Sequence, residues 1–239
     1  MSPETRMDPA PSQTHQVYAS LRAAILSLET SPGERLSERG LETAYGASRT
    51  PARAALMRLE AEGLVAREGR GWIVSPIDLG EVHAISEMRA AVESAAVRYA
   101  VERAAPADVA ALRALLEADE GPGRDSEARV VRAGTNFHAE LTRLSGNAVM
   151  TQTVQDALTR LERTRWLEVR TPEARQAAWD DHLAIVDAIA RRDADAAAAL
   201  VERHIHGTNE RLIEALTAER RRFRGSGLAI VGDVPGRPG

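Results

Sequence analysis

The chain contains the sequence Glu34-Arg35-Leu36-Ser37-Glu38-Arg39-Gly40-Leu41, followed closely by Ala44-Tyr45-Gly46-Ala47-Ser48-Arg49-Thr50-Pro51-Ala52-Arg53-Ala54-Ala55-Leu56. Ser37 is placed to cap the N-terminus of a short helix, because its hydroxyl can accept a hydrogen bond from an unpaired N–H of the first turn. Gly46 can adopt the left-handed conformation that ends such a helix. The stretch therefore predicts a short helix that closes in a tight turn.

A second helix is expected directly after this turn. Ser48 is placed to cap it, and Pro51 lies in its first turn, where a missing N–H costs nothing. Leu56 and Leu59 lie on the stripe that must face a core. Two short helices joined by a tight turn, the second with arginine and hydroxyl side chains at its N-terminal end, are typical of a helix-turn-helix.

A β-hairpin is expected after the two helices. The residues that follow Gly63 alternate as strands do, and Gly69-Arg70-Gly71 supplies the turn between them. A hairpin in this position is a wing. The N-terminal part of the chain is therefore predicted to be a winged helix-turn-helix that binds duplex DNA.

The same residues resemble the DNA-binding domain of GntR-type bacterial transcription factors. The resemblance spans about Gln16 to Pro76 and rests on five motifs in the right order: Pro32-Gly33-Glu34-Arg35-Leu36, Ser37-Glu38-Arg39, Ser48-Arg49-Thr50-Pro51-Ala52-Arg53, Leu59-Glu60-Ala61-Glu62-Gly63-Leu64-Val65 and Gly69-Arg70-Gly71. The rest of the chain resembles the all-helical effector domain of the FadR subfamily, called the FCD domain. Together the two resemblances imply a transcriptional regulator that responds to a small molecule.

Several arginines of the winged helix are expected to contact DNA. Arg49 and Arg53 lie one helical turn apart, and we assign Arg49 to base edges in the major groove. Arg70 is expected to enter the minor groove, and the remaining arginines to read bases or phosphates. The expected DNA-binding set is Arg35, Arg39, Ser48, Arg49, Thr50, Arg53 and Arg70.

The charge of the chain indicates that one copy of this module binds DNA weakly. The formal net charge of all 239 residues is −4. Phosphates respond to a local patch rather than to net charge, but the winged helix itself is barely basic. We therefore expect a homodimer that places two modules on a pseudo-palindromic operator. Contacts through the first helix of the C-terminal domain, at Val82, Ile85 and Val92, are expected to contribute to the dimer.

The sequence pattern divides the chain into a mainly α protein with two domains. A polar arm expected to be disordered (1–13) precedes the winged helix (14–76), a linker (77–80), a helical effector-binding and dimerisation domain (81–222) and a tail expected to be disordered (223–239). From Leu79 onward there is no strand signal. Helices are expected at about 79–104, 106–119, 126–145, 147–169, 172–192 and 193–222, after a first helix at 15–28. Such helices bury their apolar stripes as an antiparallel bundle.

The chain has no cysteine and no apolar run long enough to span a bilayer. Disulfides and thiolate metal sites are excluded. No membrane partner is expected, and both features are consistent with a cytoplasmic protein.

Three histidines, His138, His182 and His204, are expected to face inward from three different helices of the bundle. Neutral imidazoles that converge in a bundle core are metal ligands by preference. The alternative is that each is a hydrogen-bonded core histidine. Three together favour a divalent metal, with Zn expected from imidazole ligation and Ni or Mn as the other choices.

The FCD resemblance implies the same site and one departure from it. Metal-binding members carry an acidic or amide residue four positions before the first histidine, but this chain has Gly134 there. Asn136 lies about 200° around the helix from that face and cannot replace the missing ligand. A bound metal would then keep its full charge, and its open positions would hold water or an anionic effector.

Arg89 completes the expected effector site, because the FCD pattern has an arginine at this place that can point toward a carboxylate. The alternatives for Arg89 are a structural Arg–Glu pair or a solvated face. The expected effector-binding set is Arg89, His138, His182 and His204, and the expected effector is a small organic acid or sugar acid.

The sequence favours a ligand-responsive, sequence-specific regulator, expected to act as a repressor, and not an enzyme. Two other functions stay open at this point. Three histidines and a water could hydrolyse esters or phosphates, although no general base is evident beside them. Alternatively, the loss of a side chain at Gly134 is compatible with a DNA-binding protein whose bundle takes no effector.

Overall fold

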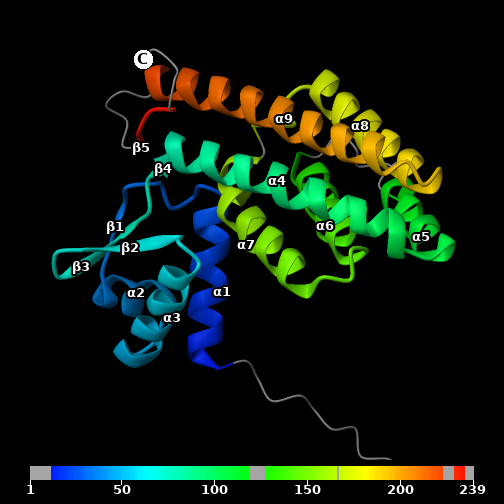
Figure 1. Cartoon of the computed structure of the whole chain (residues 1–239). Helices are drawn as coiled ribbons and strands as arrows, with labels where there is room; N and C mark the ends of the chain where they lie inside the picture. The colour runs from blue at the N-terminus through cyan, green and yellow to red at the C-terminus, as the bar shows by residue number, and fades with distance from the viewer. Residues whose placement is uncertain (1–11, 119–126, 166, 223–228, 235–239) are drawn as a thin grey trace, which may run out of the picture. The chain divides into compact units, whose positions relative to one another are not determined.

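The computed structural model describes residues 12–118, 127–165, 167–222 and 229–234. The chain divides after Pro76 into two compact units. The first unit contains α1 (Gln13–Leu26), β1 (Arg35–Leu36), α2 (Glu38–Tyr45), α3 (Arg49–Ala61), β2 (Val65–Glu68) and β3 (Gly71–Val74) (Figure 1). Its core is built from apolar side chains of the helices and the sheet, including Leu21, Ile25, Leu56, Leu59 and Trp72.

The helix-turn-helix has the expected local structure. The Ser37 hydroxyl accepts a hydrogen bond of 3.0 Å from the N–H of Gly40, and Gly46 ends α2 with a φ of 63°. Ser48 occupies the N-cap position of α3, but within the described part of the chain its side chain makes no capping hydrogen bond. Pro51 lies in the first turn of α3, as predicted.

The wing is larger than the expected hairpin. Strands β2 and β3 pair antiparallel around Gly69, which has a φ of 58°. Arg35 and Leu36 add β1 to the other side of β3, so that the strand order is β1-β3-β2. A two-residue strand is too short to show an alternating pattern in the sequence, which is why β1 was not expected.

The second unit is the predicted helical domain. It contains β4 (Ile77–Asp78), α4 (Leu79–Arg103), α5 (Pro106–Glu117), α6 (Glu127–Arg143), α7 (Ala148–Arg165), α8 (Pro172–Ala190), α9 (Ala194–Arg222) and β5 (Ile230–Val231). Helix α4 runs along α9, while α6 packs on α7 and α5 on α8 (Figure 1). Within the described residues, none of these helices combines the length and the hydropathy that a membrane crossing requires.

The expectation of no strand after Leu79 is wrong. Strand β5 pairs in parallel with β4, and Ile77 and Ile230 are buried in the same apolar cluster. The expected linker is thus part of the helical unit, and Asp78 caps α4 by accepting hydrogen bonds from the N–H groups of Gly80 and Glu81. Residues 229–234 of the expected tail are ordered through the same pairing. The other expected tail residues, and residues 1–11 of the expected arm, lie outside the described residues.

Two of the side chains expected at a dimer interface are also placed differently. Val82 and Ile85 are buried among α7 and α9 of their own unit, because they lie on the face of α4 that covers this core. Val92 is half-buried. Val82 and Ile85 are therefore core residues of the protomer.

Candidate functional site

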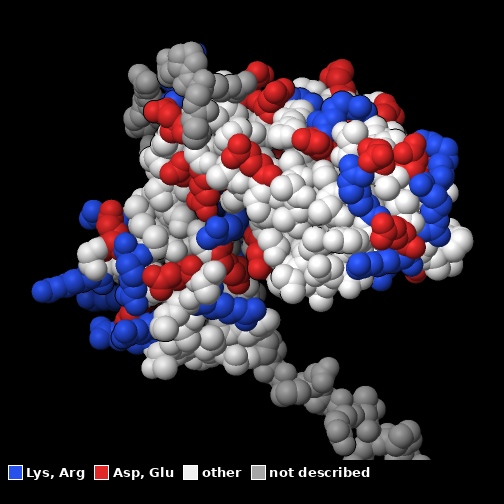
Figure 2. Space-filling model, in the orientation of Figure 1, with Lys and Arg blue, Asp and Glu red and all other residues white. Residues whose placement is uncertain are grey.

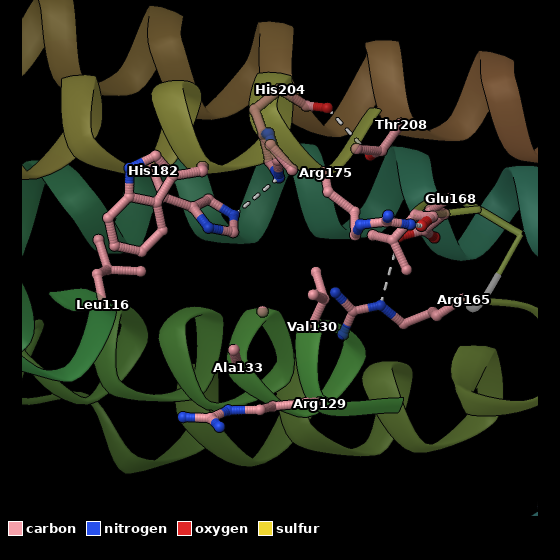
Figure 3. A pocket seen from close by; sticks show the side chains of 14 residues that line it. Leu116, Arg129, Val130, Ala133, Arg165, Glu168, Arg175, His182, His204 and Thr208 are labelled. Carbon is pink, nitrogen blue, oxygen red and sulfur yellow. Dashed lines mark hydrogen bonds and ion pairs between the residues drawn. The ribbon is translucent and has the colours of Figure 1, made fainter. Parts of the chain in front are cut away.

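The three predicted histidines meet in the core of the helical unit. His138 comes from α6, His182 from α8 and His204 from α9, and their exposed fractions are 1%, 6% and 4%. One ring nitrogen from each histidine lies within 4.8 Å of the other two. His182 Nε2 and His204 Nε2 are 3.2 Å apart and point toward one another (Figure 3). His206, two positions from His204, is half-exposed and faces elsewhere, as expected.

Two carboxylates fix the orientation of two of these rings. Nδ1 of His138 lies 2.7 Å from Oε2 of Glu93, and Nδ1 of His204 lies 3.0 Å from Oδ2 of Asp181. An ionised carboxylate only accepts, so each of these two Nδ1 atoms carries a proton, which leaves Nε2 of the same ring as the atom that could bind a metal. Carboxylates commonly orient metal-binding imidazoles in this way. The donor set therefore fits a divalent metal ion held by one ring nitrogen from each histidine.

Burial keeps His138 and His182 neutral. It lowers the pKa of His138 to about 3, although Glu93 opposes this effect. Burial, followed by the nearby ring of His204, also lowers the pKa of His182 well below its ordinary value. Burial raises the pKa of Glu93, but Arg89 and His138 outweigh it and bring the value down to about 2. At neutral pH His138 and His182 are thus neutral imidazoles, which are the form that binds metals.

Arg89 is joined to the histidine cluster through Glu93. Its Nε donates a hydrogen bond of 2.7 Å to Oε1 of Glu93, and both side chains are almost fully buried. Its Nη2 is buried without a hydrogen-bond partner among the described residues. Arg89 and His138 are not among the residues that line the cavity described next. Arg89 therefore contacts Glu93, the carboxylate that orients His138. This arrangement is close to the structural Arg–Glu pair that was the alternative for Arg89.

A cavity opens beside His182 and His204. Its empty space is about 700 Å³, with the solvent at its mouth included. The polar wall contains three arginines, one carboxylate and the two imidazoles, and the rest is mainly apolar. Figure 3 shows that the lining side chains come from α5, α6, α7, α8 and α9 and from the segment that follows α7. Residues that line the cavity include Leu116, Arg129, Val130, Gly134, Arg165, Glu168, Arg175, Trp179, His182 and His204.

The missing side chain of Gly134 leaves space that an arginine fills. A Cβ atom on Gly134 would lie 3.0 Å from Nη2 of Arg165 and 3.8 Å from Cε1 of His182. Arg165 is only 5% exposed. Its Nη1 donates to the Thr135 hydroxyl over 2.6 Å, and its Nε contacts Glu168 over 3.4 Å. The position that lacks a carboxylate is therefore occupied by a buried cation.

Several residues of this site were not predicted from the sequence. Glu93 follows Arg89 by four positions and Asp181 precedes His182, so both could have been proposed from helical spacing or adjacency. The position of Arg165 depends on how the chain turns after α7, and no local pattern reveals it. The same holds for Arg129 and Arg175, whose guanidinium groups donate to the main-chain carbonyls of Ala118 and Val169, respectively.

The expected DNA-binding residues all lie on the surface of the first unit. Blue side chains gather around the β2–β3 end of this unit in Figure 2. Arg35, Arg49 and Arg53 have side-chain exposures of 82%, 74% and 61%. The remaining members of the set, Arg39, Ser48, Thr50 and Arg70, are exposed as well. Three arginines pair with acidic neighbours: Arg35 with Glu68 at 2.9 Å, Arg49 with Glu42 at 3.3 Å and Arg53 with Glu38 at 4.0 Å.

Known proteins resemble the chain over both units. Residues 13–74 match the family described as bacterial regulatory proteins of the gntR family, and residues 84–207 match the FCD domain. The chain is 34% identical to the Nta operon transcriptional regulator of Aminobacter aminovorans over 187 residues, which are 77% of this chain and 87% of that protein. It is 26% identical to the transcriptional repressor RspR of Escherichia coli K12 over 212 residues, which cover 88% and 93% of the two chains.

Solved structures share the fold. A putative GntR transcriptional regulator from Rhodococcus sp. RHA1 superposes with a TM-score of 0.70 at 24% identity, over 86% of this chain and 99% of that one. The relatives of the present chain are transcriptional regulators and not enzymes. A metal-dependent hydrolase built on the three histidines is therefore not favoured. The protein is a ligand-responsive, DNA-binding transcriptional regulator. The chain belongs to the GntR family of bacterial regulators and carries an FCD domain as its effector-binding half.

Proposed function

We propose that His138, His182 and His204 bind one divalent metal ion, with Zn favoured and Ni or Mn as the other choices. The observation that carries this proposal is the pair of carboxylates, Glu93 and Asp181, that hold two of the rings with Nε2 available. A bound metal supplies a positive centre that attracts an anionic ligand. Arg89 then acts as a positioning residue, because it holds Glu93 against His138.

The effector in this proposal is a small organic acid in the cavity beside His182 and His204. Three arginines and one carboxylate line the cavity, so its formal charge favours an anion. The effector site belongs to the helical unit alone. The effector shifts the protein between DNA-binding arrangements only as far as its affinities for those arrangements differ.

The DNA contacts in this proposal come from the exposed arginines of the first unit. Exposed ion pairs such as Arg49–Glu42 contribute little to stability, so a phosphate or a guanine edge can replace the carboxylate at small cost. Arg49 reads bases in the major groove, Arg70 enters the minor groove and the other members of the set contact bases or phosphates. Two modules of a homodimer on a pseudo-palindromic operator provide the affinity that one module lacks.

We further propose that the protein is a repressor whose operator complex is weakened by the effector. RspR and the NanR protein of Citrobacter rodentium, 28% identical to this chain, are both named repressors. Operator binding in a gel-shift assay, with and without carboxylates, tests this proposal in wild-type protein and two variants. His182→Ala is expected to keep operator binding but to lose the response to the carboxylate that releases wild type. His206→Ala is the matched control, because its ring is half-exposed and outside the cluster.

Two outcomes would contradict the proposal. A His182→Ala protein that is still released normally by the carboxylate would return the histidines to a purely structural role. A wild-type protein whose operator complex responds to no carboxylate would favour effector-independent DNA binding.

A further inference from the structure

Arg165 is a buried cation placed at the edge of a cavity. Its Nε and Nη1 are used by Glu168 and Thr135, whereas Nη2 reaches the space beside Gly134 and next to His182. Figure 3 shows the guanidinium extending into the cavity, across from the two imidazoles. The distance from Nε of Arg165 to Oε2 of Glu168 is 3.4 Å, which is long for a hydrogen bond. The planar Nη edge is suited to a carboxylate, which a guanidinium binds with two parallel hydrogen bonds.

Charge around Arg165 also favours an anion. Arg129 and Arg175 line the same cavity, and Glu168 is the acidic residue among its lining residues. Burial lowers the pKa of Arg165, and the neighbouring Arg89 acts in the same direction. A buried positive charge that is only partly compensated gains from a second anionic partner.

The apolar part of the cavity wall determines which chemical group the bound carboxylate can carry. Leu116, Val130 and Trp179 line the cavity near the charged groups. These three side chains gain free energy by covering apolar groups, and they offer few hydrogen bonds to hydroxyl groups. A polyhydroxylated sugar acid would lose water there without replacement, whereas an aromatic or branched aliphatic acid would not.

We propose that Arg165, whose Nη2 fills the space left by Gly134, binds the carboxylate of the effector at the cavity, and that the apolar wall selects an aromatic or aliphatic carboxylate over a sugar acid. This inference rests on the proposed function for the location of the effector, but it does not require the metal. Arg165 thus takes the ligand-pairing role that the sequence had suggested for Arg89, and Gly134 becomes a specificity-determining position.

Calorimetric titration of the full-length protein, metal-free and zinc-loaded, tests the inference with three probes. Benzoate is the apolar carboxylate, benzamide its uncharged analogue and gluconate the sugar acid. We expect wild type to bind benzoate at least about tenfold more tightly than either of the other two. Arg165→Met should weaken benzoate binding by about tenfold or more, while Arg170→Met, an exposed arginine nearby, should change it less than about twofold.

Three further variants keep the test independent of folding defects. Glu168→Gln removes the competing carboxylate and should strengthen benzoate binding by about threefold. Gly134→Ala keeps every charge but crowds Nη2, so it should weaken benzoate binding. The double variant Arg165→Met with Glu168→Leu leaves no buried charge unpaired and should lose benzoate binding even if Arg165→Met alone is unstable.

The inference is overturned if folded Arg165→Met, or the folded double variant, binds benzoate as tightly as wild type. It is also overturned if gluconate or benzamide binds better than benzoate, or if no carboxylate binds at millimolar concentration. Failure of the metal proposal is distinguishable. A wild-type protein that retains no zinc contradicts the metal site, whereas carboxylate affinities of the same metal-free protein still decide the role of Arg165.

Discussion

Nδ1 of His138 lies 2.7 Å from Oε2 of Glu93, and both side chains are almost completely buried in the helical unit. Glu93 also accepts a hydrogen bond from Arg89, so its carboxylate connects the Arg89 guanidinium to His138, a candidate metal ligand. The three residues form a continuous buried network in which each member orients the next.

Glu93→Gln should destabilise the helical unit and weaken metal binding together. Loss of the charge leaves Arg89 buried without an ionic partner, which costs about 3–5 kcal/mol in comparable buried pairs. Loss of an orienting carboxylate costs about 10–100-fold in metal affinity. Urea unfolding and zinc titration measure the two effects. Glu87→Gln, on the exposed face of the same helix, is the control and should change neither. Wild-type stability in Glu93→Gln would contradict the network.

The metal-free protein should lose stability as the pH falls from about 7 to about 4. The folded-state pKa of His138 is about 3 and its ordinary value 6.5, so below 6.5 the unfolded state binds the proton more strongly. Glu93, with a folded-state pKa of about 2 and an ordinary value of 4.5, adds stability above 4.5 that is lost below it. Both shifts therefore act in the same direction. Urea unfolding at several pH values should show a smaller decrease between 6.5 and 4.5 for His138→Gln than for wild type.

Gly232→Ala should destabilise the helical unit through the β4–β5 pairing. Gly232 has a φ of 71°, and a Cβ there would clash with Oδ1 of Asp78, the residue that caps α4. The substitution must disturb either the cap or the strand, and about 1–3 kcal/mol of stability is at risk. Gly207→Ala is the matched glycine control. It lies within α9 with only ordinary contacts to a new Cβ, and should stabilise by up to about 1 kcal/mol. Equal thermal midpoints for the two variants would contradict the assigned role of β5.

Arg49→Ala should weaken operator binding and flatten sequence preference, because a bidentate arginine–guanine contact carries about 1–3 kcal/mol of discrimination. Glu42→Gln should act in the opposite direction. It removes the carboxylate that lies 3.3 Å from Arg49 in the free protein, so DNA no longer competes with it. Fluorescence anisotropy on operator and scrambled duplexes separates affinity from specificity, and Arg191→Ala, on the surface of the other unit, is the control. Wild-type affinity and specificity in Arg49→Ala would remove Arg49 from the interface.

Most of the fold follows from local signals. Ser37, Gly46 and Asp78 act at helix ends, where one side chain or one φ value determines the boundary, and the structure confirms all three. The inward position of the histidines follows from helical periodicity, since each lies on an apolar face. Strands β1 and β5 could not be predicted, because two residues carry no period and their pairing depends on partners far along the chain.

The candidate site could be predicted only in part, for the same physical reason. His138, His182 and His204 are positioned by the faces of their own helices. Arg165 reaches the site from the last residue of α7, and its position depends on the following turn and on the absence of a side chain at Gly134. The glycine at position 134 indicates from the sequence that a metal ligand has been lost, but it does not reveal that Arg165 fills the space.

The decisive measurement is the zinc content of protein that has been stripped with chelator, reloaded with zinc and desalted. We predict about one zinc ion per chain in wild type and in His206→Ala, and almost none in His182→Ala, because three imidazoles are the minimum donor set of this site. Zinc retained equally by all three proteins, or by none of them, would contradict a metal centre at His138, His182 and His204.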